Sequence, residues 1–227
     1  MNILTPVQLE ALKAIDTPTI CNAIERFKVR NAVTGFVGLD IHCLYPQLGV
    51  TLGYALTVTV DSSTPDVKRD DQAWKDWARA MAAAPQPIFL VFQDVGLNPE
   101  KSAHMGEIMA SLAKRLGAVG LLTNGGVRDI LEVEQLGFQY FAAGVVASHG
   151  NPRLLQVNVP VTIDGLQIEP GDLLHGDLNG VAKIPAEIAA QTTELAFKIR
   201  QEEAELLAYI RSPEFTVEGF IQKKFTH

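Results

Sequence analysis

Two short groups of residues in the middle of the chain have types and spacing suited to chemistry on a small acid. The first is Gly106-Glu107-Ile108-Met109, at the predicted start of a helix, and the second is Arg128-Asp129, with twenty residues between Glu107 and Arg128. The free N–H groups and the dipole of a helix N-terminus favour an anion. An arginine binds a carboxylate through two hydrogen bonds, and carboxylates hold a divalent cation directly or through its waters. Together the two groups predict a site for a keto acid and a metal ion.

A purely structural role fits the same residues. One of the acids would cap a helix, and Arg128 and Asp129 would form an ordinary surface ion pair. The pattern alone leaves both readings open.

The elements around these groups explain how they could meet. A helix over 106–116 is followed by Gly117, which accepts the left-handed conformation at a helix end, and then by a buried strand over 118–123. The predicted apolar face of the helix consists of Ile108, Met109, Leu112 and Leu116. Asn124-Gly125-Gly126 predicts a turn, after which Arg128-Asp129 start a new helix. Because α/β sheets place ligands at the carboxyl ends of their strands, both groups can share one crevice.

The rest of the chain predicts strands between helices at both chain ends, with α/β or α+β layering. Helices are expected from Thr5, from Asp16 to about Phe27, and over 185–211; strands are expected at 53–60, 87–92, 138–143, 155–163, 166–168, 173–175 and 180–184. The strand at 53–60 alternates as if half-buried, 61–71 is expected to be an exposed loop, and 175–177 a β-turn. Asp164-Gly165 predicts a hairpin turn. Trp74 and Trp77, at helical spacing, are expected to pack or to form a subunit contact rather than to bind a ligand.

Composition favours a single domain over residues 1–227 in a reducing compartment. The net charge of −7 offers no basic face for a nucleic-acid partner. The two cysteines lack metal-ligand spacing and are expected to be reduced thiols, as in cytoplasmic proteins. The N-terminus has no signal-peptide pattern and no apolar run is long enough for a membrane span.

A few polar residues have more than one reading. Asp94 follows a buried strand and could approach a metal or form a turn, and His104 could be a general base or a solvated loop residue. Glu202 and Glu203 flank the apolar stripe of the C-terminal helix, where a charged residue usually forms a salt bridge at the rim.

Several motifs occur in the order and spacing of a known family. They are Thr17–Phe27, Gly53-Tyr54-Ala55, Asp94-Val95-Gly96, Glu107 with Arg128-Asp129 and Glu132, Leu136-Gly137-Phe138, Val157–Pro160, Pro170-Gly171-Asp172 and Asp177–Pro185. Over roughly residues 5 to 211 the chain resembles the RraA-like family, which includes the class II 4-hydroxy-4-methyl-2-oxoglutarate / 4-carboxy-4-hydroxy-2-oxoadipate aldolases. The resemblance implies an α/β fold of the β/β/α swivelling type, assembled as a homotrimer or homohexamer. The C-terminal helix, about 185–211, would then pack at a subunit interface.

The resemblance implies a metal-dependent lyase that cleaves a 4-hydroxy-2-oxo acid and releases pyruvate, with accompanying oxaloacetate decarboxylase activity. The amides of 106–109 and Arg128 would bind the substrate carboxylate, Asp129 would anchor Mg²⁺ or Mn²⁺ largely through waters, and Glu107 would act on the C4 hydroxyl through a water. Glu202 or Glu203 would reach the site of a neighbouring subunit. A Schiff-base mechanism is disfavoured because no lysine follows a strand at this edge.

The same family contains non-catalytic regulators of ribonuclease activity, which form the alternative. Those proteins differ from the aldolases at the aspartate after the arginine, and this chain keeps Asp129. Glu107 stands where characterised aldolases usually have aspartate, and Asn124 where many members have aspartate. A related decarboxylase or dehydratase acting on a sugar-derived acid is a further alternative.

Overall fold

The computed structural model describes residues 3–62 and 71–225, so most of the predicted loop at 61–71 lies outside the described residues. The helices are α1 (Pro6–Lys13), α2 (Thr17–Phe27), α3 (Asp71–Ala83), α4 (Glu107–Arg115), α5 (Ile130–Leu136), α6 (Ala189–Ile210) and α7 (Val217–Phe225), with short 3₁₀ turns at Pro46–Leu48 and Pro99–Lys101. The strands are β1 (His42–Cys43), β2 (Thr51–Asp61), β3 (Ile88–Asp94), β4 (Ala118–Val127), β5 (Gln139–Val145), β6 (Arg153–Val157), β7 (Val161–Ile163), β8 (Leu166–Ile168), β9 (Leu173–Asp177) and β10 (Gly180–Ile184).

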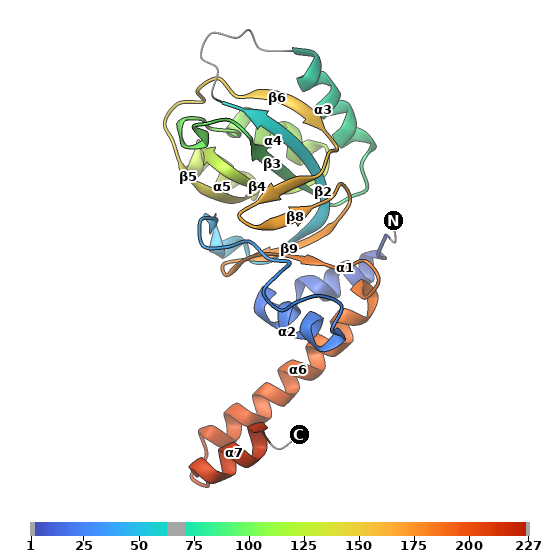
Figure 1. The fold of residues 1–227 in the computed structure, drawn as a ribbon, viewed down its shortest axis with the longest axis vertical. Coiled ribbons are helices and arrows are strands. Elements are labelled where there is room, and N and C mark those ends of the chain that lie inside the picture. Colours follow the sequence, from blue (N-terminus) through green and yellow to red (C-terminus); the bar gives the residue numbers. More distant parts are fainter. Residues whose placement is uncertain (1–2, 63–70, 226–227) are drawn as a thin grey trace.

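One mixed sheet organises the molecule. Its order is β1-β5-β4-β3-β2-β9-β10, with β6 also paired to β2. The four central strands β2 to β5 are parallel, and β1, β6, β9 and β10 are antiparallel to their neighbours. The sheet curves into a nearly closed barrel, and a Cβ at Gly176 of β9 would lie 2.7 Å from the Phe141 ring of β5. This confirms the α/β fold with helices at both chain ends (Figure 1).

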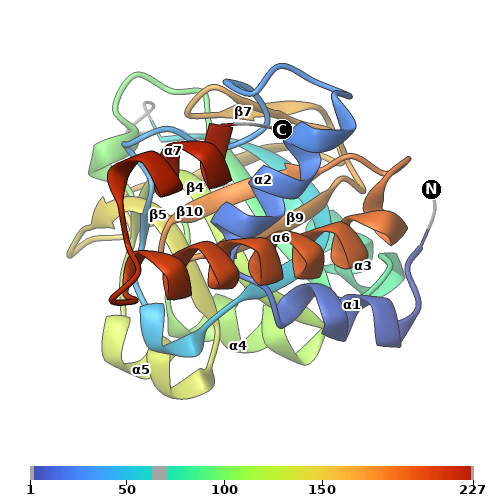
Figure 2. The same ribbon diagram turned by 90° about the horizontal axis from the view of Figure 1, so that it is seen from below.

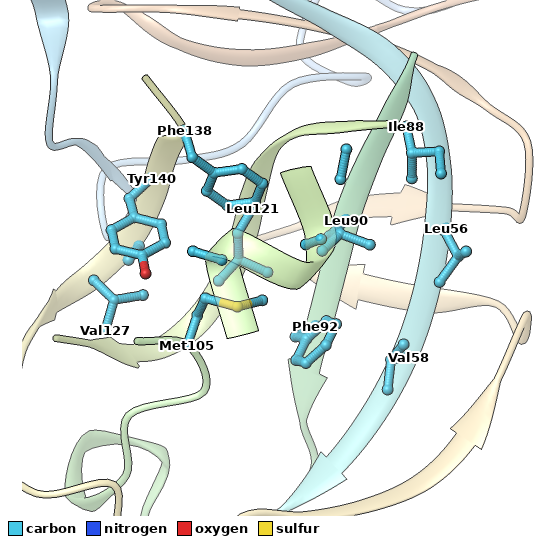
Figure 3. Close-up of a cluster of buried hydrophobic side chains, with 14 of the residues drawn as sticks. Leu56, Val58, Ile88, Leu90, Phe92, Met105, Leu121, Val127, Phe138 and Tyr140 are labelled. Atoms are coloured by element: carbon cyan, nitrogen blue, oxygen red, sulfur yellow. The ribbon is translucent and has the colours of Figure 1, made fainter. Parts of the chain in front are cut away.

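The outer face of the parallel strands carries the largest apolar cluster. Leu56, Leu90 and Leu121 project into this cluster from neighbouring strands (Figure 3). Helices α3 and α4 cover it, and Trp77 of α3 is fully buried against Phe92. The β7–β8 hairpin covers the opposite face. Because both faces are covered, the parallel strands are apolar on both sides.

A third cluster joins the two ends of the chain. Helices α1 and α2 pack with the first half of α6 against β2, β9 and β10. The second half of α6 leaves the body, and α7 folds back beside it, so the two helices form a projecting arm (Figures 1 and 2). No helix within the described ranges is both long and apolar enough to cross a membrane.

One expectation for the central stretch is half right and another is wrong. Met109 and Leu116 pack against the core as predicted, but Ile108 and Leu112 are 82% and 38% exposed, and α4 buries Ala110 and Ala113 most deeply. Small residues allow the helix to lie close to the sheet, which turns Ile108 and Leu112 outward. Residues 124–126 do not form a turn, since β4 continues to Val127 with a shift of register against β5.

Three expectations elsewhere are also corrected. β2 is buried along almost its whole length because it is paired on both edges and covered on both faces. Residues 175–177 lie in β9, and the turn follows at 178–179. The strand expected over 155–163 divides at Asn158, whose φ of 57° separates β6 from β7.

Candidate functional site

The segment before α4 pairs with the end of β4, and this pairing builds the site. Ser102 O accepts from Gly126 N at 3.1 Å, His104 N donates to Gly126 O at 2.8 Å, and Arg128 N donates to Met105 O at 3.1 Å. A Cβ at Gly126 would lie 3.0 Å from Ser102 O, so glycine allows this close approach. The backbone thus carries the start of α4 directly alongside Arg128 and Asp129.

Gly106 is the N-cap of α4 and leaves the helix end open. Gly106 has no side chain with which to cap the helix, and the first N–H groups of any helix have no intrahelical acceptor. The carboxylate Oδ2 of Asp129 accepts from Glu107 N at 2.9 Å and lies 3.7 Å from Arg128 Nε. A Cβ at residue 106 would lie 2.5 Å from that Oδ2 and 3.0 Å from Arg128 Nε. Only glycine leaves room for this arrangement, in which the amides of Ile108 and Met109 remain available to an anion.

Asp129 has a strained backbone and a side chain that points away from the helix it precedes. It stands at the N-cap of α5 with φ 57° and ψ 49°, yet makes no side-chain cap bond to that helix. A left-handed non-glycine residue costs about 1–3 kcal/mol, although aspartate tolerates it better than most. The carboxylate is directed to α4 instead. Asp129 is therefore a helix-capping acid and a surface partner of Arg128, as the structural reading predicted, but the helix it caps is α4 and it does so beside a cleft.

The cleft has a volume of about 410 Å³ and contains the predicted residues of both groups. Gly106, Glu107, Ile108, Met109, Arg128 and Asp129 all line it, together with Trp74, residues 103–105 and residues 149–152. Such a volume suits a small organic acid. The polar groups lie at the carboxyl ends of parallel strands, as the sequence predicted.

The contribution of His149-Gly150-Asn151-Pro152 could not be foreseen from the sequence. The segment forms one wall of the cleft. Ser102 Oγ donates to His149 O at 2.7 Å, and a Cβ at Gly150 would lie 2.8 Å from Lys101 O. The only signal in the sequence was the turn-forming glycine and proline, which give no position in space.

The donor set fits a divalent cation only if waters supply most of its ligands. Within the described parts of the chain no three His, Cys, Asp or Glu side chains cluster as metal ligands. Asp129 offers a carboxylate that is 36% exposed and whose Oδ1 enters no hydrogen bond or ion pair of these residues. Mg²⁺ keeps several waters and is commonly held by one or two carboxylates. Asp129 would anchor such an ion, and Glu107 lines the same cleft.

His104 and Asp94 are structural neighbours of the site rather than surface residues. His104 is 3% exposed, with Nε2 2.9 Å from Asp94 Oδ2 and Nδ1 2.7 Å from Thr123 Oγ1. Burial would raise the pKa of Asp94, but hydrogen bonds from His104, Ser62 and Gly96 outweigh it and lower the pKa. The reading of His104 as a solvated loop residue is therefore wrong, and both of its ring nitrogens are engaged by neighbouring side chains.

Asn124 has a clear structural role. Its Oδ1 accepts from Asp94 N at 2.7 Å and its Nδ2 donates to Asp94 O at 2.9 Å. An aspartate could not make the second bond because it has no donor when ionised. The asparagine therefore ties the ends of β3 and β4 together.

Glu202 and Glu203 lie outside the cleft. Both are on the exposed part of α6, where Glu202 pairs with Arg26 at 2.6 Å and Glu203 accepts from Asn22 at 3.4 Å. They line a separate hollow between α6 and α7. Within one chain the structure does not bring them to the residues of the cleft.

Comparison with known proteins places these features in a family. The model of the RraA-like family (Aldolase/RraA) matches residues 17–182. An uncharacterized protein of Methanocaldococcus jannaschii is 34% identical over 119 residues, which are 52% of this chain and 57% of that protein. A Halalkalibacterium halodurans protein provisionally named 4-hydroxy-4-methyl-2-oxoglutarate aldolase is 37% identical over 81 residues, 35% of this chain and 39% of that one. The matches thus span less than two thirds of either relative.

Solved structures share the fold at low identity. An uncharacterized protein from Pseudomonas syringae pv. tomato gives a TM-score of 0.75 at 23% identity, covering 100% of this chain and 96% of that one. Streptomyces coelicolor RraAS2, described as an unusual member of the RNase ES inhibitor RraA family, gives 0.71 at 22% identity, covering 90% and 98%. The family match extends from α2 into β10 and includes every strand of the parallel core. The protein belongs to the RraA-like family.

Proposed function

We propose that the protein is a divalent-metal-dependent lyase that cleaves a 4-hydroxy-2-oxo acid and releases pyruvate, with accompanying oxaloacetate decarboxylase activity. The observation that carries this proposal is the meeting of open α4 amides, a guanidinium and a carboxylate in one cleft. A 2-oxo acid presents a carboxylate next to a carbonyl, and these are the groups such donors bind. The relative provisionally named as an aldolase supports the same class of reaction.

The residues of the cleft have distinct parts in the proposed reaction. The amides of Ile108 and Met109 and the fork of Arg128 bind the substrate carboxylate. Glu107 accepts the proton of the C4 hydroxyl through a water. The C3–C4 bond then breaks, the C4 oxygen becomes a carbonyl, and the electron pair passes to the C2 oxygen as the pyruvate enolate. Arg128 stabilises that negative charge, and protonation at C3 completes pyruvate.

Asp129 is the residue that would hold the cation. A bound divalent ion would supply positive charge to the oxygens of the 2-oxo acid. The Asp129 carboxylate also fixes the start of α4 through Glu107 N, so it orders the anion-binding amides as well.

A panel of 2-oxo acids tests the proposal. Turnover is followed as pyruvate release with Mg²⁺ or Mn²⁺, and oxaloacetate is included because its decarboxylation forms the same enolate. We expect activity that a chelator removes and that added metal restores. Full activity in chelator would contradict the metal dependence, and no pyruvate from any member would favour a decarboxylase or dehydratase acting on a sugar-derived acid.

A non-catalytic binding role is the second candidate, and exposed apolar side chains favour it. Ile108 is 82% exposed at the cleft and Leu131 of α5 is 67% exposed. Such a surface suits a protein partner, and a structural neighbour is described within an RNase inhibitor family. A purified protein that binds ribonuclease but turns over no 2-oxo acid would support this candidate over the lyase.

We also propose a homotrimer or homohexamer in which the arm packs on a neighbouring subunit. The arm exposes Leu207, Ile210, Phe215, Val217, Ile221 and Phe225. Apolar residues on a projecting helix pair are costly in water unless covered, and a closed ring would cover them. Light scattering tests the assembly with a chain ending at Glu203, because the first half of α6 belongs to the core and must be kept. An assembled truncated chain would contradict the role of the arm.

A further inference from the structure

We propose that His104 is a positioning residue, held by Asp94 and Thr123, which keeps the start of α4 against Arg128 and Asp129. The inference deepens the proposed function and rests on it for its kinetic consequence. Its structural part concerns only how the two halves of the cleft are held together. In this role His104 does not touch the substrate.

The segment that His104 anchors is buried, and its Met105 packs in the largest apolar cluster. Residues 102–105 belong to no regular strand, and pair with β4 through a single parallel bridge between Ala103 and Gly126. Three backbone hydrogen bonds join the two segments between Ser102 and Arg128. Two residues after His104 comes Gly106, whose helix end must stay open for the amides to work. A small slip of this segment would move the amides away from Arg128.

The ring of His104 links three elements at once. Its Nε2–H donates to Asp94 Oδ2 at the end of β3, and its Nδ1 is 2.7 Å from Thr123 Oγ1 of β4. Thr123 Oγ1 also accepts from Gly125 N at 3.1 Å. The Thr123 hydroxyl can therefore give its hydrogen to Nδ1 of the neutral ring while accepting from the Gly125 amide.

The surroundings of the ring leave no substitute for these bonds. Both side chains of the His104–Asp94 pair are fully buried, and Thr123 is 0% exposed. A Cβ at Gly125 would run into the imidazole, so the glycine exists to admit the ring. A buried polar group that loses its partner pays its full desolvation cost. Removing the side chain of His104, Asp94 or Thr123 should therefore shift residues 102–105, because water does not enter to replace the lost hydrogen bond.

A second buried histidine offers a matched control. His175 of β9 is also 0% exposed, with Nδ1 2.9 Å from Thr17 Oγ1 and Nε2 3.2 Å from Leu12 O. It joins α1 and α2 to the sheet and lines no part of the cleft. Loss of its threonine hydroxyl should lower stability without touching the amides of α4.

The experiment compares Thr123→Val with Thr17→Val, which remove the same hydroxyl and preserve the same shape. Thr123→Ser keeps the hydroxyl and is the rescue variant. If Thr123→Val fails to fold, His104→Gln takes its place and is compared with Thr123→Ser. Three properties are measured in each full-length variant: the unfolding midpoint, hydrogen exchange of the amides at 106–109, and binding of oxalate with Mg²⁺ by calorimetry. Oxalate is used because it resembles the pyruvate enolate in charge and shape.

We expect Thr123→Val to exchange the 106–109 amides faster and to weaken oxalate binding by about tenfold, the effect of one lost buried hydrogen bond. Thr17→Val should lower the unfolding midpoint but leave both other properties unchanged, and Thr123→Ser should behave as the wild type. Equal exchange and equal oxalate affinity in the two valine variants would overturn the positioning role. If the wild type binds no oxalate, the proposed function fails, and the exchange comparison still decides the role of His104.

Discussion

Replacing Gly106 with alanine should separate catalysis from stability at the cleft. The backbone at Gly106 has φ −140° and ψ −174°, an extended conformation that alanine adopts without strain. The added Cβ would lie 2.5 Å from Asp129 Oδ2 and 3.0 Å from Arg128 Nε. Since an ordinary contact needs about 3.5 Å, the carboxylate must retreat by about 1 Å. The hydrogen bond from Glu107 N, now 2.9 Å, would then be broken.

The size of the effect follows from that bond. A hydrogen bond to a charged group contributes about 1.5–3 kcal/mol. If its loss is felt fully in the transition state, kcat/KM should fall between about tenfold and about 150-fold. The unfolding midpoint should change little, because alanine reduces the entropy of the unfolded chain and so offsets part of the loss. Pyruvate release across a range of substrate concentrations, with calorimetric unfolding of the same preparation, measures both.

A second glycine provides the control. Gly144 of β5 has no positive φ, and a Cβ there would meet no atom within 4 Å. Gly144→Ala should therefore keep wild-type kinetics. Wild-type kcat/KM in Gly106→Ala would refute the reasoning, since it would show that the reaction does not need Asp129 against the end of α4. An equal loss in both variants would point to a general effect on folding.

The remaining predictions concern charge, metal and assembly. Arg128→Lys should lower kcat/KM almost as much as Arg128→Ala, roughly a hundredfold, because an ammonium lacks the planar fork. Near wild-type kinetics in Arg128→Lys would show that Arg128 only forms an ion pair and does not bind the substrate carboxylate. Asp129→Ala should abolish metal-dependent turnover while circular dichroism shows an intact fold. Metal-dependent activity in this variant would show that Asp129 does not anchor the metal ion. Burial lowers the pKa of His175 from 6.5, so the folded protein keeps it neutral. The unfolded chain binds that proton more readily, so the contribution of His175 to stability should be level above pH 6.5 and fall below it; an unfolding midpoint with the same pH dependence in His175→Gln as in the wild type would contradict this. Glu202→Gln and Glu203→Gln should leave assembly unchanged, and the one that lowers turnover would be the glutamate that reaches a neighbouring site.

The sequence predicted the elements and the site better than it predicted burial. The capping residues Thr5 and Asp16, the Asp164-Gly165 turn and Gly117 mark their boundaries locally, and the structure has each of them in place. The buried face of α4 was predicted only in part, since Met109 and Leu116 pack on the core while Ile108 and Leu112 are exposed. Apolar spacing shows that a face exists but not which part of it the sheet covers. The glycines at 125 and 126 were read as a turn for a similar reason. A glycine needed for close approach looks the same in the sequence as one needed for a bend.

By itself the sequence determined which residues could do chemistry. Residue type fixes what an arginine, a carboxylate or an open helix end can bind, and local patterning placed them at the ends of neighbouring elements. Only the tertiary structure decided that Asp129 turns away from its own helix to cap α4, that residues 149–152 close the cleft, and that His104 is buried between Asp94 and Thr123. These contacts join residues from separate elements. Such contacts depend on how the strands pair and the helices pack, which no local pattern in one sequence specifies.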